Sequence, residues 1–155
     1  MIRTYRPGDR DALIDVTIRA FDGVSVDQDI EKLFGGPIHG VGWQQRKARH
    51  IDADIAANPQ GIFVFDAGGV AVGYITCRFD PTTRIGWIPN FAVHPDHQGC
   101  GVGRQLMEAA LTYLRARGMA CVRIETLEQN TRCTTFYPSI GFQEIAHQIH
   151  YILRL

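Results

Sequence analysis

The chain has 155 residues, is 45% apolar, and carries 16 Lys and Arg against 16 Asp and Glu. This length fits a single domain, residues 1–155, that buries roughly 70% of the surface of its unfolded chain. Zero net charge argues against a broad electrostatic attraction to nucleic acid or to an acidic membrane surface. No apolar run approaches the roughly eighteen residues of a membrane span.

The first ten residues are polar and lack the apolar core of a secretory signal. The four cysteines form no C-x-x-C pair, which gives a zinc site or a redox motif little support. We therefore expect free thiols in a cytoplasmic protein that needs no metal.

The first sixty residues contain two patterns of helical period. In chain order we expect a strand, a helix, a loop and a second helix, over residues 2–6, 7–21, 22–40 and 43–58. The second helix is predicted because Trp43, Lys47 and Ile51 recur at four-residue spacing. Asn58-Pro59 is a typical end for such a helix.

The rest of the chain alternates between strands and helices. A hairpin around Ala67-Gly68-Gly69 is followed by a strand, the strongest helix, a strand, a short helix and a closing hairpin, over residues 61–79, 85–93, 102–118, 121–127, 131–141 and 142–155. Pro89 cannot donate to a ladder, so we expect a bulge or an unpaired position there. The element order predicts a mixed α/β sheet with helices between strands.

The stretch HPDHQGCGVGR, residues 94–104, places glycines at positions 99, 101 and 103 between a strand and the strongest helix. A helix N-terminus leaves unpaired N–H groups, and glycines let an anion approach them. The stretch lacks the lysine and hydroxyl of a Walker loop and the G-x-G-x-x-G spacing of a dinucleotide fingerprint. From the glycines alone, a tight turn without a ligand remains the alternative.

The wider context resembles a known family. FAVHPDHQGCGVGRQLM, residues 91–107, is similar to the central motif of the GNAT superfamily of N-acetyltransferases, with Gln98, Gly101 and Gly103 at its signature positions. The resemblance continues downstream and covers about residues 62–145, whereas the first sixty residues match only in element order. The downstream positions in register are Glu125, Asn130, Tyr137, Gly141 and Phe142.

The resemblance implies the acyl-CoA N-acyltransferase (GNAT) fold, a mixed, largely antiparallel sheet flanked by helices, with acetyl-CoA as acetyl donor. The glycine loop would bind the pyrophosphate, and the strand end before it would pair with the pantetheine arm. The N–H of Val93 would stabilise the oxyanion of the thioester carbonyl. The implied cofactor-binding residues are Phe91, Ala92, Val93, Gln98, Gly99, Cys100, Gly101, Val102, Gly103, Arg104 and Asn130.

Tyr137 is the implied general acid for the departing thiolate. The alternative is an aromatic core residue, because FYPSIGF, residues 136–142, is largely apolar. Pro138 departs from the family pattern, and proline disfavours a helical conformation of the residue before it. We therefore expect this proline to disturb the placement of the Tyr137 hydroxyl.

Glu125 is the candidate general base, directly or through water. Alternation along the strand places Arg123, Glu125 and Leu127 on one face, and a carboxylate in mid-strand needs a partner or a role. The alternative is an ion pair with Arg123 or another arginine. The strand before the glycine loop, where many family members carry a carboxylate, has only Ile88, Pro89 and Asn90 here.

The resemblance implies transfer of the acetyl group to an amine. At pH 7 only about one alkylamine in 2,500 is unprotonated, so a base is needed. The acidic residues in 22–31 would attract a cationic amine, unless they form only a solvated loop. We expect a small-molecule amine first and a peptide N-terminus or lysine second.

Two further classes compete with an enzyme of this kind. One is a non-catalytic module that binds CoA, which the missing carboxylate and Pro138 would fit. The other is a nucleotide-binding protein unrelated to CoA, which would be stabilised by ATP or NAD. A homodimer is expected by resemblance to the family.

Overall fold

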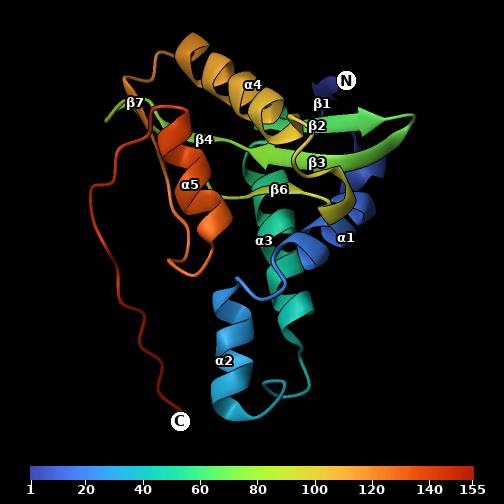
Figure 1. Cartoon of the computed structure of the whole chain (residues 1–155), viewed down its shortest axis with the longest axis vertical. Coiled ribbons are helices and arrows are strands. Elements are labelled where there is room, and N and C mark those ends of the chain that lie inside the picture. Colours follow the sequence, from blue (N-terminus) through green and yellow to red (C-terminus); the bar gives the residue numbers. More distant parts are fainter.

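The computed structural model describes all 155 residues and has a β-sheet at its centre, in two hydrogen-bonded parts (Figure 1). Every neighbouring pair is antiparallel except β5 and β7, which are parallel. The predicted mixed, largely antiparallel sheet is thus confirmed. The first part is β1 (Ile2–Thr4), β2 (Ile62–Ala67), β3 (Val70–Thr76) and β6 (Phe91–Val93); the second is β4 (Arg78–Asp80), β5 (Ile85–Ile88) and β7 (Cys121–Ile124).

The two parts are joined by the chain itself, because β3 leads into β4 and β5 leads into β6. The strand predicted over 85–93 is interrupted at Pro89 and Asn90, as expected from a residue that cannot donate to a ladder. Beyond this interruption β6 pairs with β3 but not with β7, so one edge of β6 is open.

Helices cover both faces of the sheet, with α4 on one face and α1 and α3 on the other (Figure 1). Because neighbouring residues of a strand face opposite sides, Ile62 and Val64 pack with α1 and α3, whereas Phe63 and Phe65 pack on the α4 side. The helices are α1 (Arg10–Ala20), α2 (Val26–Phe34), α3 (Trp43–Ala57), α4 (Val102–Ala116) and α5 (Thr131–Ser139).

The prediction of a loop over residues 22–40 is wrong for residues 26–34, which form α2. The N-cap residue of α2 is Ser25, which has an extended backbone. Gly35 ends the helix in the left-handed region, with φ of 76°. These terminal signals are in the sequence. The apolar residues Val26, Ile30, Leu33 and Phe34 also recur at helical spacing, although no residue of the helix is buried.

The closing hairpin predicted over 142–155 is also wrong. These residues form no strand, and they run to the C-terminus apart from the sheet (Figure 1). The two residues between the two predicted strands, His147 and Gln148, include no Gly, Asn or Asp to favour a tight hairpin turn. The strand predicted over 121–127 is shorter as well, since β7 ends at Ile124.

Candidate active site

The glycine loop connects β6 to α4 through a short turn. Its three glycines are needed for two different physical reasons. Gly99 and Gly101 have φ of 78° and 80°, a conformation that residues with a Cβ rarely adopt. Gly103 lies in the first turn of α4, where an added Cβ would come within 3.2 Å of Cζ of Phe91. The first two glycines shape the loop, and the third lets α4 approach β6.

Six consecutive backbone N–H groups of this loop, from Gly99 to Arg104, have no hydrogen-bond acceptor in the protein. The first helical bond that returns to the loop is donated by Gln105 to Gly101, at 3.2 Å. Free donors at the positive end of a helix attract an anion. The predicted strand-to-helix context of these donors is therefore confirmed, and the arrangement suits a phosphate-sized anion.

The open edge of β6 offers a second set of backbone groups. Asn90 accepts from Thr76 N–H and His94 donates to Val72, both at 2.8 Å, so alternate residues from 90 to 94 face β3. Phe91 and Val93 therefore direct their N–H and C=O groups to the open edge. An extended ligand with amide groups could add to this edge as a further strand.

Two predicted binding side chains have structural partners in the protein. Gln98 Nε2 donates to the carbonyl of Val93 at 2.8 Å, which ties the loop to β6. Asn130 Oδ1 accepts from the Cys133 N–H at 3.3 Å and caps α5. Val102 and Ala92 have buried side chains, so only their backbone groups are available to a ligand.

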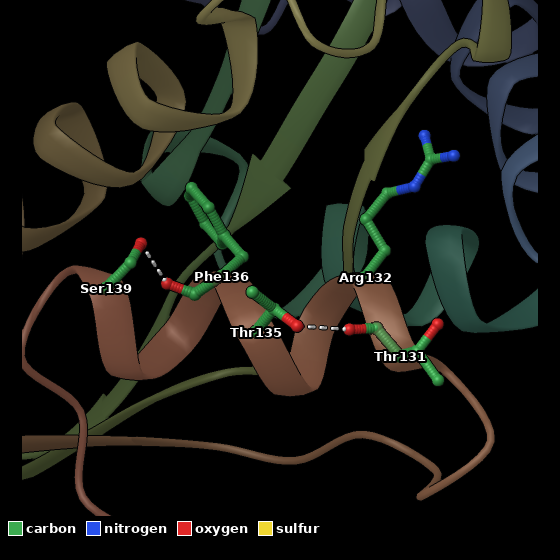
Figure 2. A pocket seen from close by; sticks show the side chains of 5 residues that line it. All are labelled: Thr131, Arg132, Thr135, Phe136 and Ser139. Atoms are coloured by element: carbon green, nitrogen blue, oxygen red, sulfur yellow. Dashed lines mark hydrogen bonds between the residues drawn. The ribbon is translucent and has the colours of Figure 1, made fainter.

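A hollow of about 550 Å³ lies on α5. Figure 2 shows its lining residues, Thr131, Arg132, Thr135, Phe136 and Ser139. Phe136 packs against Phe91 of β6 with ring centroids 5.8 Å apart, so this hollow adjoins the edge of β6. Arg132 is exposed and forms no ion pair. It adds a free positive charge at the hollow on α5.

Tyr137 is helical, since α5 continues through Pro138 to Ser139. The expected disturbance by the proline is therefore absent at the level of the backbone. The Tyr137 ring lies between Phe136 and Phe142, with centroids 5.9 Å from each, and is 9% exposed. Burial raises the pKa of its hydroxyl above the ordinary value, with a further contribution from Cys133, so the group stays protonated at neutral pH.

A second cavity, of about 250 Å³, lies where α3 meets β5 and β7. Asp54 of α3 is 3% exposed at its wall, although no sequence motif predicted a role for it. Its Oδ1 accepts from Arg78 Nε at 2.9 Å, and its Oδ2 accepts from Thr76 and from Asn90 Nδ2, both at 2.7 Å. The buried carboxylate of Asp54 thus lies next to Asn90. The chain between β5 and β6 carries no carboxylate of its own there.

Arg123 and Glu125 line the same cavity, which confirms that they share one face. Glu125 is the first residue after β7 and not in mid-strand. The hypothesis of an ion pair between the two residues is wrong, since neither forms a salt bridge with any group. Arg123 instead lies over Trp87 of β5, with its guanidinium carbon 5.6 Å from the ring centroid.

Two basic groups of α3 lie near this cavity. His50 lines it, and burial lowers the pKa of its imidazole, with Lys47 adding to the effect. Lys47 is 8% exposed, donates to Asn90 Oδ1 at 3.1 Å and lies over the Phe21 ring. Burial lowers the pKa of Lys47 as well. The spacing of Lys47, Ile51 and Asp54 on one helix face was the available signal for this cluster.

The acidic residues of 22–31 are largely paired within their own neighbourhood. Asp27 and Glu31 both lie 3.3 Å from Arg46, and Asp29 lies 3.1 Å from Lys32. Of the two aromatic residues near this segment, Trp43 is buried in the core and Phe34 is stacked by Arg154. Arg46 is shared by two carboxylates and Asp22 has no cationic partner, so the segment keeps part of its negative charge.

The cavity and the glycine loop lie at opposite ends of β6. Asn90, at the cavity wall, directly precedes Phe91, and Val93 ends the strand before the loop. A ligand along the open edge of β6 would therefore reach from the free N–H groups to the cavity with Glu125. This arrangement suits a transfer reaction between an anionic donor and a second substrate.

Comparison with known proteins identifies the class. The model of the acetyltransferase (GNAT) family matches residues 27–142, well over half of the chain, and the chain belongs to this family. Among solved structures, the PaiA N-acetyltransferase of Thermoplasma acidophilum in complex with coenzyme A has a TM-score of 0.74 at 18% identity. That match covers 92% of this chain and 89% of the other, and it supports the predicted fold.

Curated relatives include the mycothiol acetyltransferases of Thermobispora bispora, 29% identical over 147 residues, and of Rhodococcus jostii, 27% identical over 148 residues. These matches cover 91% and 88% of this chain but 45% and 48% of the relatives, so the chain spans about half of their length. A GNAT acetyltransferase of Brucella melitensis in complex with acetyl-CoA has a TM-score of 0.66 at 22% identity, covering 93% of this chain and 82% of the other. No helix of the structure is both long and apolar enough to cross a membrane.

Proposed function

We propose that the protein is an N-acetyltransferase that moves an acetyl group from acetyl-CoA to the primary amine of a small molecule, by direct attack in a ternary complex. The observation that carries the proposal is the open edge of β6, which leads from six free N–H groups to a cavity with an unpaired carboxylate. Family membership supports acetyl-CoA as donor. When bound, acetyl-CoA supplies an activated thioester carbonyl to the nucleophile.

The loop donors of Gly99 to Arg104 would neutralise the phosphates of the donor, and Arg132 would add a positive charge from α5. The N–H and C=O of Phe91 and the N–H of Val93 would hold its amide arm in extended form, whereas the Val93 carbonyl already accepts from Gln98. The Val93 N–H then faces the position where negative charge develops on the carbonyl oxygen, and a fixed donor there lowers the barrier.

Two side chains would move protons. Glu125 is exposed at the cavity and carries no counter-ion, so it is available to take a proton from the ammonium group, directly or through water. Tyr137 retains its proton at neutral pH and would supply it to the departing thiolate. His50, with its pKa lowered by burial, is a second candidate base at the same cavity.

A small acceptor is favoured by the size of the cavity. Its volume of about 250 Å³ is below the roughly 300–1,000 Å³ typical of sites for drug-sized ligands. The mycothiol acetyltransferases among the relatives are named after a small-molecule substrate. A peptide N-terminus or lysine is the second candidate acceptor, and a CoA-binding module without catalysis is the third.

We further infer a cytoplasmic location and a homodimer. All four cysteines are free, which fits a reducing compartment. The segment from Ile145 to Leu155 exposes large apolar side chains, among them Ile149, Tyr151 and Leu153. Burial of these side chains against a second copy would remove an unfavourable exposed apolar surface.

The test is thiol release from acetyl-CoA over a panel of amines, with CoA binding measured separately by calorimetry. We expect turnover with at least one small amine and a product acetylated on nitrogen. Turnover with peptides alone would favour the second candidate. CoA binding without turnover of any amine would contradict catalysis and favour the binding module, and stabilisation by ATP or NAD instead of CoA would contradict the donor assignment.

A further inference from the structure

The cavity beside β5 and β7 holds five ionisable side chains, and their charges are not equally compensated. Asp54 and Arg78 form a pair with an Nη2–Oδ1 distance of 2.7 Å, so their charges cancel. His50 is neutral at pH 7 because its pKa lies below the ordinary value. One cation, Arg123, and one anion, Glu125, remain without a charged partner in the protein.

The guanidinium of Arg123 is held in place without using its N–H donors. It lies over the Trp87 ring, and Trp87 is also the residue of β5 that pairs with Arg123 in the parallel ladder. Stacking on an aromatic ring positions an arginine and leaves its in-plane donors free for an oxyanion. A planar guanidinium fork matches a carboxylate in particular.

Glu125 lies two residues further along the same face, which corresponds to about 7 Å between the two Cα atoms. The two side chains converge on one cavity but lie more than 4.0 Å apart, so each can bind its own group. A ligand with an ammonium group at Glu125 and an anionic group at Arg123 would complement both charges.

We infer that the acceptor carries a carboxylate close to its reactive amine, as a small amino acid does. This inference rests on the proposed function, since it names the substrate class of the same site. The cavity volume of about 250 Å³ suits such a ligand better than a large polyamine or an aminoglycoside. Arg123 would bind the carboxylate, and Glu125 would face the amine.

The experiment compares each of the twenty L-amino acids with its primary amide, which has the same amine but no charge at the carboxyl end. Thiol release gives kcat/KM for each pair, and the panel also includes spermidine, tyramine and kanamycin. For at least one pair we expect the acid to exceed the amide roughly tenfold or more, the loss typical of one charge-assisted hydrogen bond. Arg123→Gln should reduce that ratio to about 2 or less, mainly through KM of the acid.

Arg115→Gln is the matched control, because Arg115 is an exposed arginine of α4 outside the cavity. It should leave the ratio unchanged, and thermal melting would show that both variants fold. Equal use of acids and amides, or an equal loss for both in Arg123→Gln, would overturn the inference. Turnover of spermidine, tyramine or kanamycin but of no amino acid would overturn it too, while the proposed function stands. Failure of every amine would overturn both.

Discussion

The proposed donor side and the proposed acceptor side of the site are built in different ways. The donor side consists of consecutive backbone groups, the N–H donors of Gly99 to Arg104 and the open edge of β6. The acceptor side consists of side chains from α3, β4, β5 and the end of β7, which lie far apart in the sequence. A backbone site tolerates changes of side chain where the chain geometry persists, whereas a side-chain site depends on each partner.

The largest effect is expected for Asp54→Ala. This change leaves the guanidinium of Arg78 and the donors of Thr76 and Asn90 without their acceptor in a buried place. We expect the free energy of unfolding to fall by about 3–5 kcal/mol, measured by chemical denaturation.

The control for that variant is Asp52→Ala, at another position of α3. It removes an exposed ion pair between Asp52 and Arg10 of α1. It should cost less than about 1 kcal/mol. Similar losses in the two variants would show that the Asp54 network does not hold the acceptor side together.

Glu125→Gln tests the acceptor side by catalysis. Without the carboxylate the ammonium group has no base at the end of β7, and we expect kcat to fall roughly 100-fold or more. The affinity for CoA, measured by calorimetry, should not change. Glu128→Gln, an exposed neighbour outside the cavity, should keep the activity of the parent. If the activity of Glu125→Gln persisted, His50 would become the candidate base.

Tyr137→Phe removes the buried hydroxyl of the proposed general acid. We expect kcat to fall roughly 30-fold, less than the 100-fold or more typical of a well-matched acid, because burial raises the pKa of this group. Tyr74→Phe is a matched control, since its buried hydroxyl bonds to Thr17 Oγ1 at 2.7 Å. The control should lower stability by about 1 kcal/mol without slowing turnover. Equal rates in both variants would remove Tyr137 from the mechanism.

Gly101→Ala tests the donor side. Gly101 and Gly118, at the two ends of α4, have φ of 80° and 79° and open space where a Cβ would lie. Alanine at either position should cost about 1–2 kcal/mol of stability, because the left-handed conformation is strained for it. Only Gly101→Ala should also weaken CoA binding, by roughly tenfold in Kd. An equal loss of affinity in Gly118→Ala would mean that the effect is one of stability alone.

The smallest effect concerns pH. His50 has a folded-state pKa below its ordinary value of 6.5, so near pH 6 the unfolded chain binds more protons at this residue than the folded chain does. The stability contribution is therefore present above pH 6.5 and is lost as the pH falls below it. We expect the Tm of His50→Gln to decline less than that of the parent between pH 7 and 5. Parallel curves would contradict the lowered pKa of His50 at the cavity wall.

The sequence by itself predicted the glycine loop that we propose for the donor side, and the order of most elements. Glycines at 99 and 101 before a strong helix predict a left-handed backbone conformation and free N–H donors. Both are local properties of a few neighbouring residues. Pro89 likewise predicted the interruption between β5 and β6, because a missing N–H acts at its own position. Features that depend only on neighbouring residues can be predicted without knowledge of the fold.

Tertiary structure alone decided the acceptor side and the ends of the chain. Asp54 and Arg78 form their hydrogen bond only when α3 packs beside β4. Arg123 contacts Trp87 only because of the parallel register of β5 and β7. Residues 142–155 alternate as strands do but lack a turn and a pairing partner, so the alternation alone produced no hairpin. Side-chain partners and strand pairing depend on contacts between distant segments, which periodicity along the chain does not encode.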